Sequence, residues 1–125
     1  MLFSDIIGQE LIKEQLRQTV RAQRLPHAQL FSGAEGVGKL PLALAYAQYI
    51  NCENRHEHDS CGVCPSCVKF NKMVHPDLHF VFPIVKNEAK KMTVCDNFLA
   101  DFREAILTNP YVTITTWLNQ IGDGK

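Results

Sequence analysis

The segment GAEGVGK at residues 33–39 fits the pattern G-x-x-x-x-G-K and constrains the fold more than any other part of the sequence. A short apolar segment, AQLFS at residues 28–32, comes before it, and an Ala- and Leu-rich segment, PLALAYAQYI at residues 41–50, follows it. In this setting the glycines let backbone N–H groups turn inward around phosphate oxygens, and the N-terminus of the following helix adds positive potential. The pattern therefore predicts an α/β fold in which a buried parallel strand leads into a phosphate-binding loop.

Three further elements are expected from periodicity and composition. They are an amphipathic helix at residues 9–24, a strand at residues 78–85 and a second amphipathic helix at residues 96–107, which Asn109-Pro110 ends. The residues expected to face the core are Leu11, Ile12, Leu16 and Val20 in the first of these helices, and Phe98, Leu99, Phe102, Ala105 and Ile106 in the second. The order of helix, strand, glycine loop and helix is typical of a wound sheet of βαβ units.

The chemistry of the glycine loop departs from that of an active nucleotide hydrolase. The residues expected to contact phosphate are Gly33, Gly36, Gly38 and Lys39. The next residue is Leu40, where a Ser or Thr hydroxyl would normally hold Mg²⁺, and the proline after it lacks a backbone N–H. We expect no catalytic residue and no hydrolysis here, with nucleotide bound weakly or not at all. Binding through Lys39 and the backbone amides without turnover is the alternative.

Four of the five cysteines follow the spacing C-x8-C-x2-C-x2-C, and they are Cys52, Cys61, Cys64 and Cys67. Four thiolates match a closed tetrahedral zinc site, so the sequence predicts one structural zinc ion per chain. Reduced cysteines that only pack, and an iron–sulfur cluster, are the alternatives. His56 and His58 lie between the first two cysteines and are expected to be solvated, whereas Cys95 is expected to be a buried or half-buried thiol.

The overall composition gives no sign of a membrane or of a strongly charged partner. The 125 residues include 13 Lys and Arg against 13 Asp and Glu, so the formal net charge is zero. No apolar run approaches the ~20 residues of a membrane span, and the first residues lack the features of a secretory leader. We therefore expect a cytoplasmic protein with no membrane partner, in which cysteines bind metal more readily than they form disulfides.

Several segments together resemble the bacterial DNA polymerase III clamp loader, whose AAA+ subunits load the sliding clamp onto primed DNA. They are DIIGQE at residues 5–10, PHAQLFSG at residues 26–33, the four-cysteine insertion after the loop helix, and HPD at residues 75–77. The resemblance covers about residues 1–85. It implies a partial P-loop NTPase of the AAA+ type, with residues 1–125 as the truncated N-terminal part of that domain and residues 52–67 as a zinc-binding insertion. Residues 86–125 match the family poorly and receive no role.

Within that family, the sequence favours a stator subunit over a motor subunit. Leu40, Pro41 and the HPD segment are similar to the delta-prime type, which often has a degenerate loop, whereas a gamma or tau subunit would carry Thr or Ser after Lys39. The resemblance implies gamma/tau and delta subunits as direct partners, and the sliding clamp and primed DNA as partners of the assembled complex. It also implies that His75 is a structural turn residue.

Two other functions remain open. One is an ATP-binding gamma/tau-type ATPase subunit. The other is a stand-alone zinc module that binds nucleic acid, although the basic residues near the cysteines are matched by acidic ones: Arg55, Lys69 and Lys72 against Glu53, Glu57 and Asp59.

Overall fold

The computed structural model describes residues 1–86 and 94–122, which form two compact units, Met1–Leu78 and His79–Lys125. The first unit contains the 3₁₀ turn η1 (Phe3–Asp5) and the helices α1 (Glu10–Arg21), α2 (Lys39–Asn51) and α3 (Pro65–Asn71). The second contains the 3₁₀ turn η2 (Cys95–Phe98) and the helices α4 (Leu99–Thr108) and α5 (Ile114–Gly122). Each unit is described by itself.

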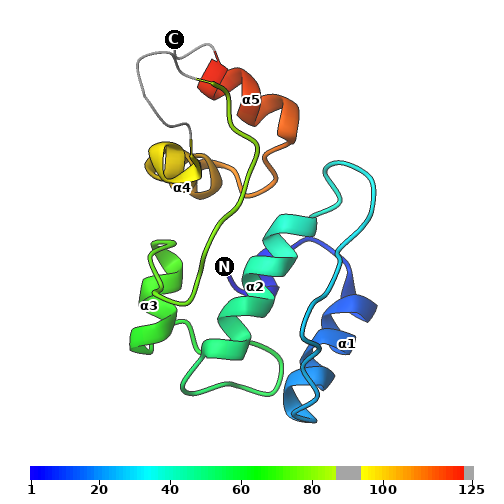
Figure 1. The fold of residues 1–125 in the computed structure, drawn as a ribbon. Coiled ribbons are helices and arrows are strands. Elements are labelled where there is room, and N and C mark those ends of the chain that lie inside the picture. The colour runs from blue at the N-terminus through cyan, green and yellow to red at the C-terminus, as the bar shows by residue number, and fades with distance from the viewer. Residues whose placement is uncertain (87–93, 123–125) are drawn as a thin grey trace. The chain divides into compact units, whose positions relative to one another are not determined.

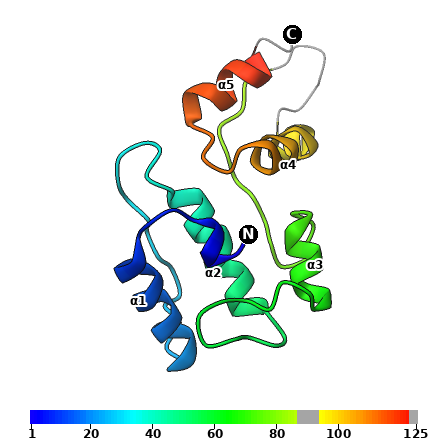
Figure 2. The ribbon, with the colours of Figure 1, turned by 180° about the vertical axis from the view of Figure 1, so that it is seen from behind.

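Helix α2 is the central element of the first unit. It lies between α1 and α3 in both views of the ribbon (Figures 1 and 2). Its sequence is apolar on most sides, as expected of a helix that is covered by neighbours. The core of the unit is built from η1, α1 and α2, and its buried residues are Phe3, Ile6, Leu16, Val20, Leu42, Ala45, Tyr46 and Tyr49. Helix α2 therefore carries both the glycine loop at its start and a cysteine at its end.

The predicted helix at residues 9–24 is confirmed as the shorter α1, but its buried face differs from the prediction. Leu16 and Val20 are buried as expected, whereas Leu11 is 83% exposed and Ile12 is 42% exposed. Lys13 and Arg17 lie in the buried face instead. The prediction failed because apolar periodicity treats every Lys and Arg as solvent-facing, while their long aliphatic stems can be buried when the charged end has a partner.

Both buried cations have such partners. Nζ of Lys13 donates to the carbonyl oxygen of Ile6 at 2.7 Å, which ties the segment before α1 to the helix. The Arg17 guanidinium lies 5.3 Å from the centre of the Phe3 ring and donates to Glu14 at 2.7 Å. The two cations thus hold η1 against α1.

The two predicted strands are absent: no β-strand occurs in residues 1–86 or 94–122. The strands predicted at residues 28–32 and 78–85 are therefore not formed in the described chain, and the wound sheet stays a prediction. A strand exists only where a second strand supplies backbone hydrogen bonds, and neither segment has such a neighbour among the described residues. Leu30 is 90% exposed and Val81 is 94% exposed, so an apolar side chain in each segment has nothing packed over it.

The second unit has a small aromatic core. Phe82 stacks on Phe102 with ring centres 4.1 Å apart, and both rings make edge-to-face contacts with Trp117. Nε1 of Trp117 donates to the carbonyl oxygen of Pro83 at 2.7 Å. The helix predicted at residues 96–107 is confirmed as η2 followed by α4, with four of its five expected core residues buried and Leu99 only partly so. Within the described residues, no helix is both long and apolar enough to cross a membrane.

Candidate functional site

The four predicted metal ligands converge on one point. The sulfur atoms of Cys52, Cys61, Cys64 and Cys67 all lie within 4.8 Å of one another. Sγ of Cys61 is 3.6 Å from Sγ of Cys52 and 4.0 Å from Sγ of Cys67, and all four thiols are free of disulfide bonds. Zinc with four sulfur ligands at about 2.3 Å needs sulfur–sulfur separations of about 3.8 Å. The cluster could therefore hold a metal ion, and its spacing is compatible with zinc.

Two helix ends position the cysteines. Cys52 is the residue that closes α2, and Cys64 is the residue that precedes α3, where its sulfur accepts a hydrogen bond from the backbone N–H of Cys67 at 3.4 Å. Pro65 suits the first position of α3 because its fixed φ matches a helix and its missing N–H has no partner there. Because α3 begins at Pro65, Cys67 lies in its first turn.

Backbone N–H groups prepare the cluster for thiolates. Two further amides point at sulfur: that of Cys61 at Sγ of Cys52, 3.4 Å away, and that of Cys64 at Sγ of Cys61, 3.3 Å away. Burial alone would raise the pKa of the Cys64 thiol, but the amides of Glu53 and Cys67 and the neighbouring thiols outweigh it and lower that pKa to about 6. Cys64 therefore ionises more readily than Cys52 or Cys67, and a metal ion would have to displace the protons of those two thiols.

At the two enclosed thiols, Cys52 and Cys67, the effect of burial on the pKa outweighs that of the hydrogen bonds. Desolvation raises the pKa of Cys52 and raises that of Cys67 to about 12. Buried thiols with raised pKa values are poor nucleophiles, so Cys52 and Cys67 are poorly suited to redox chemistry. A divalent cation at the centre would stabilise the ionised form of both thiols and so lower their pKa values.

The other candidate metal ligands lie apart from the four sulfurs. His56 and His58 are exposed in the loop between α2 and α3, as predicted, and neither joins the cluster. Cys95 belongs to the second unit, where it is half-buried and its thiol donates to the carbonyl oxygen of Phe82 at 3.4 Å. Both observations agree with the roles expected from the sequence.

Asp59 anchors the cysteine loop, and we did not single it out from the sequence. One carboxylate oxygen accepts from the backbone N–H groups of Phe3 and Ser60 at 2.9 Å, and the other accepts from Ser4 at 3.0 Å. Asp59 therefore joins the loop between Cys52 and Cys61 to η1. The contact spans more than 50 residues of chain, so no local pattern could have revealed it.

The glycine loop leads into α2 as predicted. Gly36 and Gly38 have φ values of +79° and +95°, which other residues rarely adopt, and Gly38 is the residue before the helix. Nζ of Lys39 donates to the carbonyl oxygen of Gly33 at 2.7 Å, so the lysine folds back over the loop. The structure thus brings Gly33 and Lys39 together, with Gly36 and Gly38 in the turn between them.

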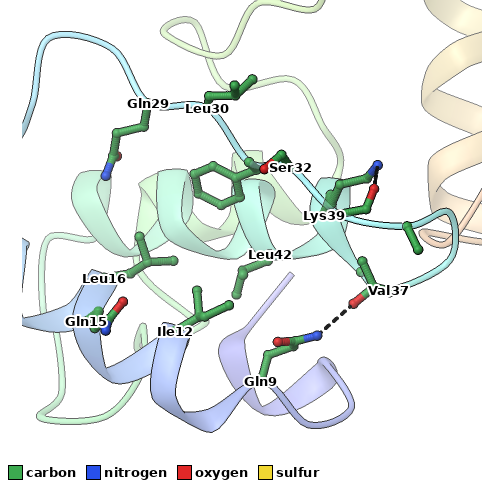
Figure 3. A pocket seen from close by; sticks show the side chains of 14 residues that line it. Gln9, Ile12, Gln15, Leu16, Gln29, Leu30, Ser32, Val37, Lys39 and Leu42 are labelled. Atoms are coloured by element: carbon green, nitrogen blue, oxygen red, sulfur yellow. Dashed lines mark hydrogen bonds between the residues drawn. The ribbon is translucent and has the colours of Figure 1, made fainter.

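A pocket of about 590 Å³ lies beside this loop. Figure 3 shows Ile12 and Leu16 from α1, Leu42 from α2 and Leu30 from the preceding segment around it, with Lys39 at the end nearest the loop. Nε2 of Gln9 donates to the carbonyl oxygen of Val37 at 3.3 Å across its mouth. The volume is within the range of small-ligand sites, and the combination of an apolar wall with one cation suits a flat ring joined to phosphates.

Two residues at the start of α2 weaken this pocket as a nucleotide site. Leu40 is the second residue of the helix and has no oxygen for Mg²⁺, and Pro41, the third, is buried and has no N–H for a phosphate. Both residues therefore lie in the first turn of α2.

His75 sits in the turn after α3. Its ring packs on Phe70 with centres 4.5 Å apart, and Nδ1 accepts from the backbone N–H of Asp77 at 3.1 Å. Both contacts serve the turn, in line with the structural role expected.

A G-x-x-x-x-G-K loop at the start of a buried helix, beside a pocket with one lysine, is an arrangement typical of proteins of the P-loop NTPase type. The family model described as "DNA polymerase III, delta subunit" matches residues 8–114, and the chain belongs to that family. The family match extends to residue 114, whereas we expected the resemblance to end near residue 85. The family model therefore includes α4.

Relatives among characterised proteins match about half of the chain. DNA polymerase III subunit tau of Escherichia coli is 42% identical over 65 residues, which are 52% of this chain and 10% of the relative. The tau subunit of Bacillus subtilis is 37% identical over 65 residues, 52% of this chain and 12% of the relative. Protein STICHEL-like 4 of Arabidopsis thaliana is 33% identical over 69 residues, 55% of this chain and 7% of the relative.

The chain therefore spans only about a tenth of the length of these relatives. No solved structure matches it.

Replacing Asp59 tests the anchor of the cysteine loop. We expect Asp59→Ala to lower the free energy of unfolding by about 2 kcal/mol, because backbone N–H groups of η1 lose a charged acceptor. Amide hydrogen exchange in the full chain should show faster exchange at Phe3 and Ser4 than in the parent protein. The matched control is Asp77→Ala, an exposed carboxylate in the same unit, which should leave both amides unchanged. Equal protection in Asp59→Ala and the parent would contradict the anchor.

Proposed function

We propose that the chain is a non-catalytic, stator-like subunit of a DNA polymerase III clamp loader, of the delta-prime type. The observation that carries the proposal is the pair Leu40 and Pro41 at the start of α2, where a hydrolase needs a hydroxyl for Mg²⁺ and a free N–H. The family match supports the clamp-loader part of the proposal, and the altered loop supports the stator part. No residue of the chain is assigned a catalytic role.

The glycine loop would then be a structural remnant of a nucleotide site. The contact between Lys39 and the Gly33 carbonyl satisfies the lysine within the loop itself, so a phosphate must displace it to bind. The loop also carries Glu35, whose negative charge would repel the phosphates of a bound nucleotide. ATP is accordingly a doubtful ligand, and Gly33, Gly36, Gly38 and Lys39 would be its contacts if it binds.

The four cysteines would hold one structural zinc ion per chain. All four positions of a tetrahedron are filled by Cys52, Cys61, Cys64 and Cys67, which leaves no open position for a reacting water molecule. The positive charge of the ion would offset the negative charges of the four thiolates. The ion would also join the end of α2 to the start of α3. This zinc-binding insertion covers residues 52–67, inside an AAA+ domain to which residues 1–125 contribute the N-terminal part.

The wound sheet expected from the sequence enters the same proposal. Residues 28–32 and 78–85 would become strands once neighbouring strands pair with them, which would also cover Leu30 and Val81. Such a sheet would place the glycine loop at the carboxyl end of a strand, as in P-loop proteins.

The proposed partners are the gamma/tau and delta subunits, with the sliding clamp and primed DNA engaged through the assembled complex. A chain with no formal net charge would act through neighbouring subunits more than through DNA. Its place would be the bacterial cytoplasm, where the chromosome is replicated.

An ATPase subunit of the gamma/tau type is the second candidate. It is favoured by the 42% identity to the tau subunit of Escherichia coli over 65 residues. The two candidates differ at Leu40, because an ATPase needs a Mg²⁺ ligand at that position.

Calorimetric titration of the full-length protein with ATP distinguishes the two candidates. We expect no Mg²⁺-dependent binding in the micromolar range, because Leu40 offers no ligand to the ion. The double variant Leu40→Thr, Pro41→Thr restores a hydroxyl and an N–H, so it should gain Mg²⁺-dependent affinity without gaining turnover. Micromolar, Mg²⁺-dependent binding of ATP by the unmodified protein would contradict the proposal.

Metal analysis tests the zinc site. The purified protein should contain about one zinc ion per chain. Cys67→Ser should lose it, because the ion would have three sulfur ligands in place of four, whereas Cys95→Ser should retain it. A chelator should also increase hydrogen exchange over residues 52–70. Protein purified without chelators that contains no zinc would rule out the site.

A further inference from the structure

Cys61 is the member of the cysteine cluster that no helix holds. Cys52 closes α2, and Cys64 and Cys67 lie at the start of α3. Cys61 lies in the loop between those two helices, yet it contacts all three of the others. Its sulfur is 3.6 Å from that of Cys52 and 4.0 Å from that of Cys67, and it accepts from the N–H of Cys64 at 3.3 Å. The position of Cys61 must therefore depend on contacts made by the loop itself.

The residues just before Cys61 are tied to η1 at the start of the chain. One carboxylate oxygen of Asp59 accepts from the backbone N–H groups of Phe3 and Ser60 at 2.9 Å, and the other accepts from that of Ser4 at 3.0 Å. Phe3 and Ser60 are both buried, which partly shields these hydrogen bonds from water. Because Ser60 directly precedes Cys61, the carboxylate fixes the backbone that carries the ligand.

The residue just after Cys61 meets the same segment of chain. Gly62 has a φ of +78°, and the two Cδ atoms of Leu2 lie 3.8 and 3.9 Å from the place that a Cβ would occupy there. The side chain of Leu2 thus packs over the turn that leads from Cys61 to Cys64. Residues 2–4 therefore contact the loop on both sides of Cys61.

Asp59 is itself held in place by the loop. Its carbonyl oxygen accepts from the backbone N–H of His56 at 2.9 Å. The carbonyl oxygen of His56 in turn accepts from the hydroxyl of Tyr49, a buried residue of α2, at 3.0 Å. The carboxylate of Asp59 is thus attached to α2 on one side and to η1 on the other.

We propose that Asp59 is a positioning residue for the metal centre: by holding Ser60 against η1, it aims the Cys61 sulfur at the other three sulfurs. Without this contact a metal ion would have to order the loop as it binds, and that cost would weaken binding. Groups one step beyond the ligands commonly set how tightly a site retains its metal. The inference rests on the proposed zinc site.

The charge of Asp59 acts in the opposite direction to its positioning role. A zinc ion with four thiolates carries a net negative charge, so a nearby carboxylate repels the site. Removal of the charge alone would therefore strengthen metal binding, whereas loss of the positioning contacts would weaken it. The sign of the effect separates the two.

Two variants of the full-length protein remove these contacts in steps. Asp59→Ala removes all three hydrogen bonds of the carboxylate, and Asp59→Asn removes the charge but keeps one oxygen for Phe3 and Ser60. The control is Val20→Ala, which takes a side chain from the core of the same unit without removing a hydrogen bond of that side chain. The measurements are zinc affinity, by competition with a colour-forming chelator, and the visible bands of the protein loaded with Co²⁺, which report how the ligands surround the metal.

We expect Asp59→Ala to lose zinc affinity by about 10- to 100-fold and to shift the Co²⁺ bands, with a smaller loss of affinity in Asp59→Asn. Val20→Ala should melt at a lower temperature than the parent but keep the parental affinity and bands. Parental affinity in both Asp59 variants, tighter binding in Asp59→Asn, or an equal loss in Val20→Ala would overturn the inference. If Asp59→Ala does not fold, Asp59→Asn decides it. A parent protein that binds no zinc would instead overturn the site itself.

Discussion

The meeting of four sulfur atoms between two helices is the constraint on which the first unit depends. Helix α3 has seven residues, which is too short to be stable in isolation. It is held at its start by Cys64, which accepts from its first turn, and by Cys67, which packs beside the end of α2. A unit of fewer than 80 residues has a limited apolar core, and small domains often need a metal or another covalent link to remain folded.

The same arrangement relates the cysteine cluster to the glycine loop. Helix α2 begins with Lys39 and ends at Cys52, so one buried helix connects the two motifs. Fixing its end at the sulfurs also fixes the direction of its start, where the loop and the pocket lie. In the proposed stator subunit, such a rigid connection would let the chain present fixed surfaces to neighbours without a nucleotide to order the loop. Leu40 and Pro41 lie in the first turn of α2 and do not interrupt the helix.

Motifs with fixed spacing could be read from the sequence, and long-range contacts could not. The four cysteines, the glycine loop and the helix that follows it all lie where local spacing places them, because a short turn or a helix end determines their geometry. The buried face of α1 could not be predicted, since it depends on whether the charged end of Lys13 finds the Ile6 carbonyl. The same holds for Asp59, which accepts hydrogen bonds from Phe3 and Ser4 at the start of the chain.

The two strands predicted at residues 28–32 and 78–85 illustrate a different limit of prediction from sequence. The segments AQLFS and LHFVFPIV have the composition of strands, but composition does not provide the neighbouring backbone that a strand needs. What the sequence specifies at these positions is an apolar segment of suitable length, and the pairing is a property of the whole sheet.

The central claim is that four sulfurs of this chain surround one zinc ion. X-ray absorption at the zinc edge of the purified full-length protein tests it most directly, because it reports the type, number and distance of the atoms bound to the metal. The account predicts four sulfur neighbours at about 2.3 Å and no nitrogen or oxygen in the first coordination shell. A spectrum that requires nitrogen or oxygen ligands, or fewer than four sulfurs, would contradict it.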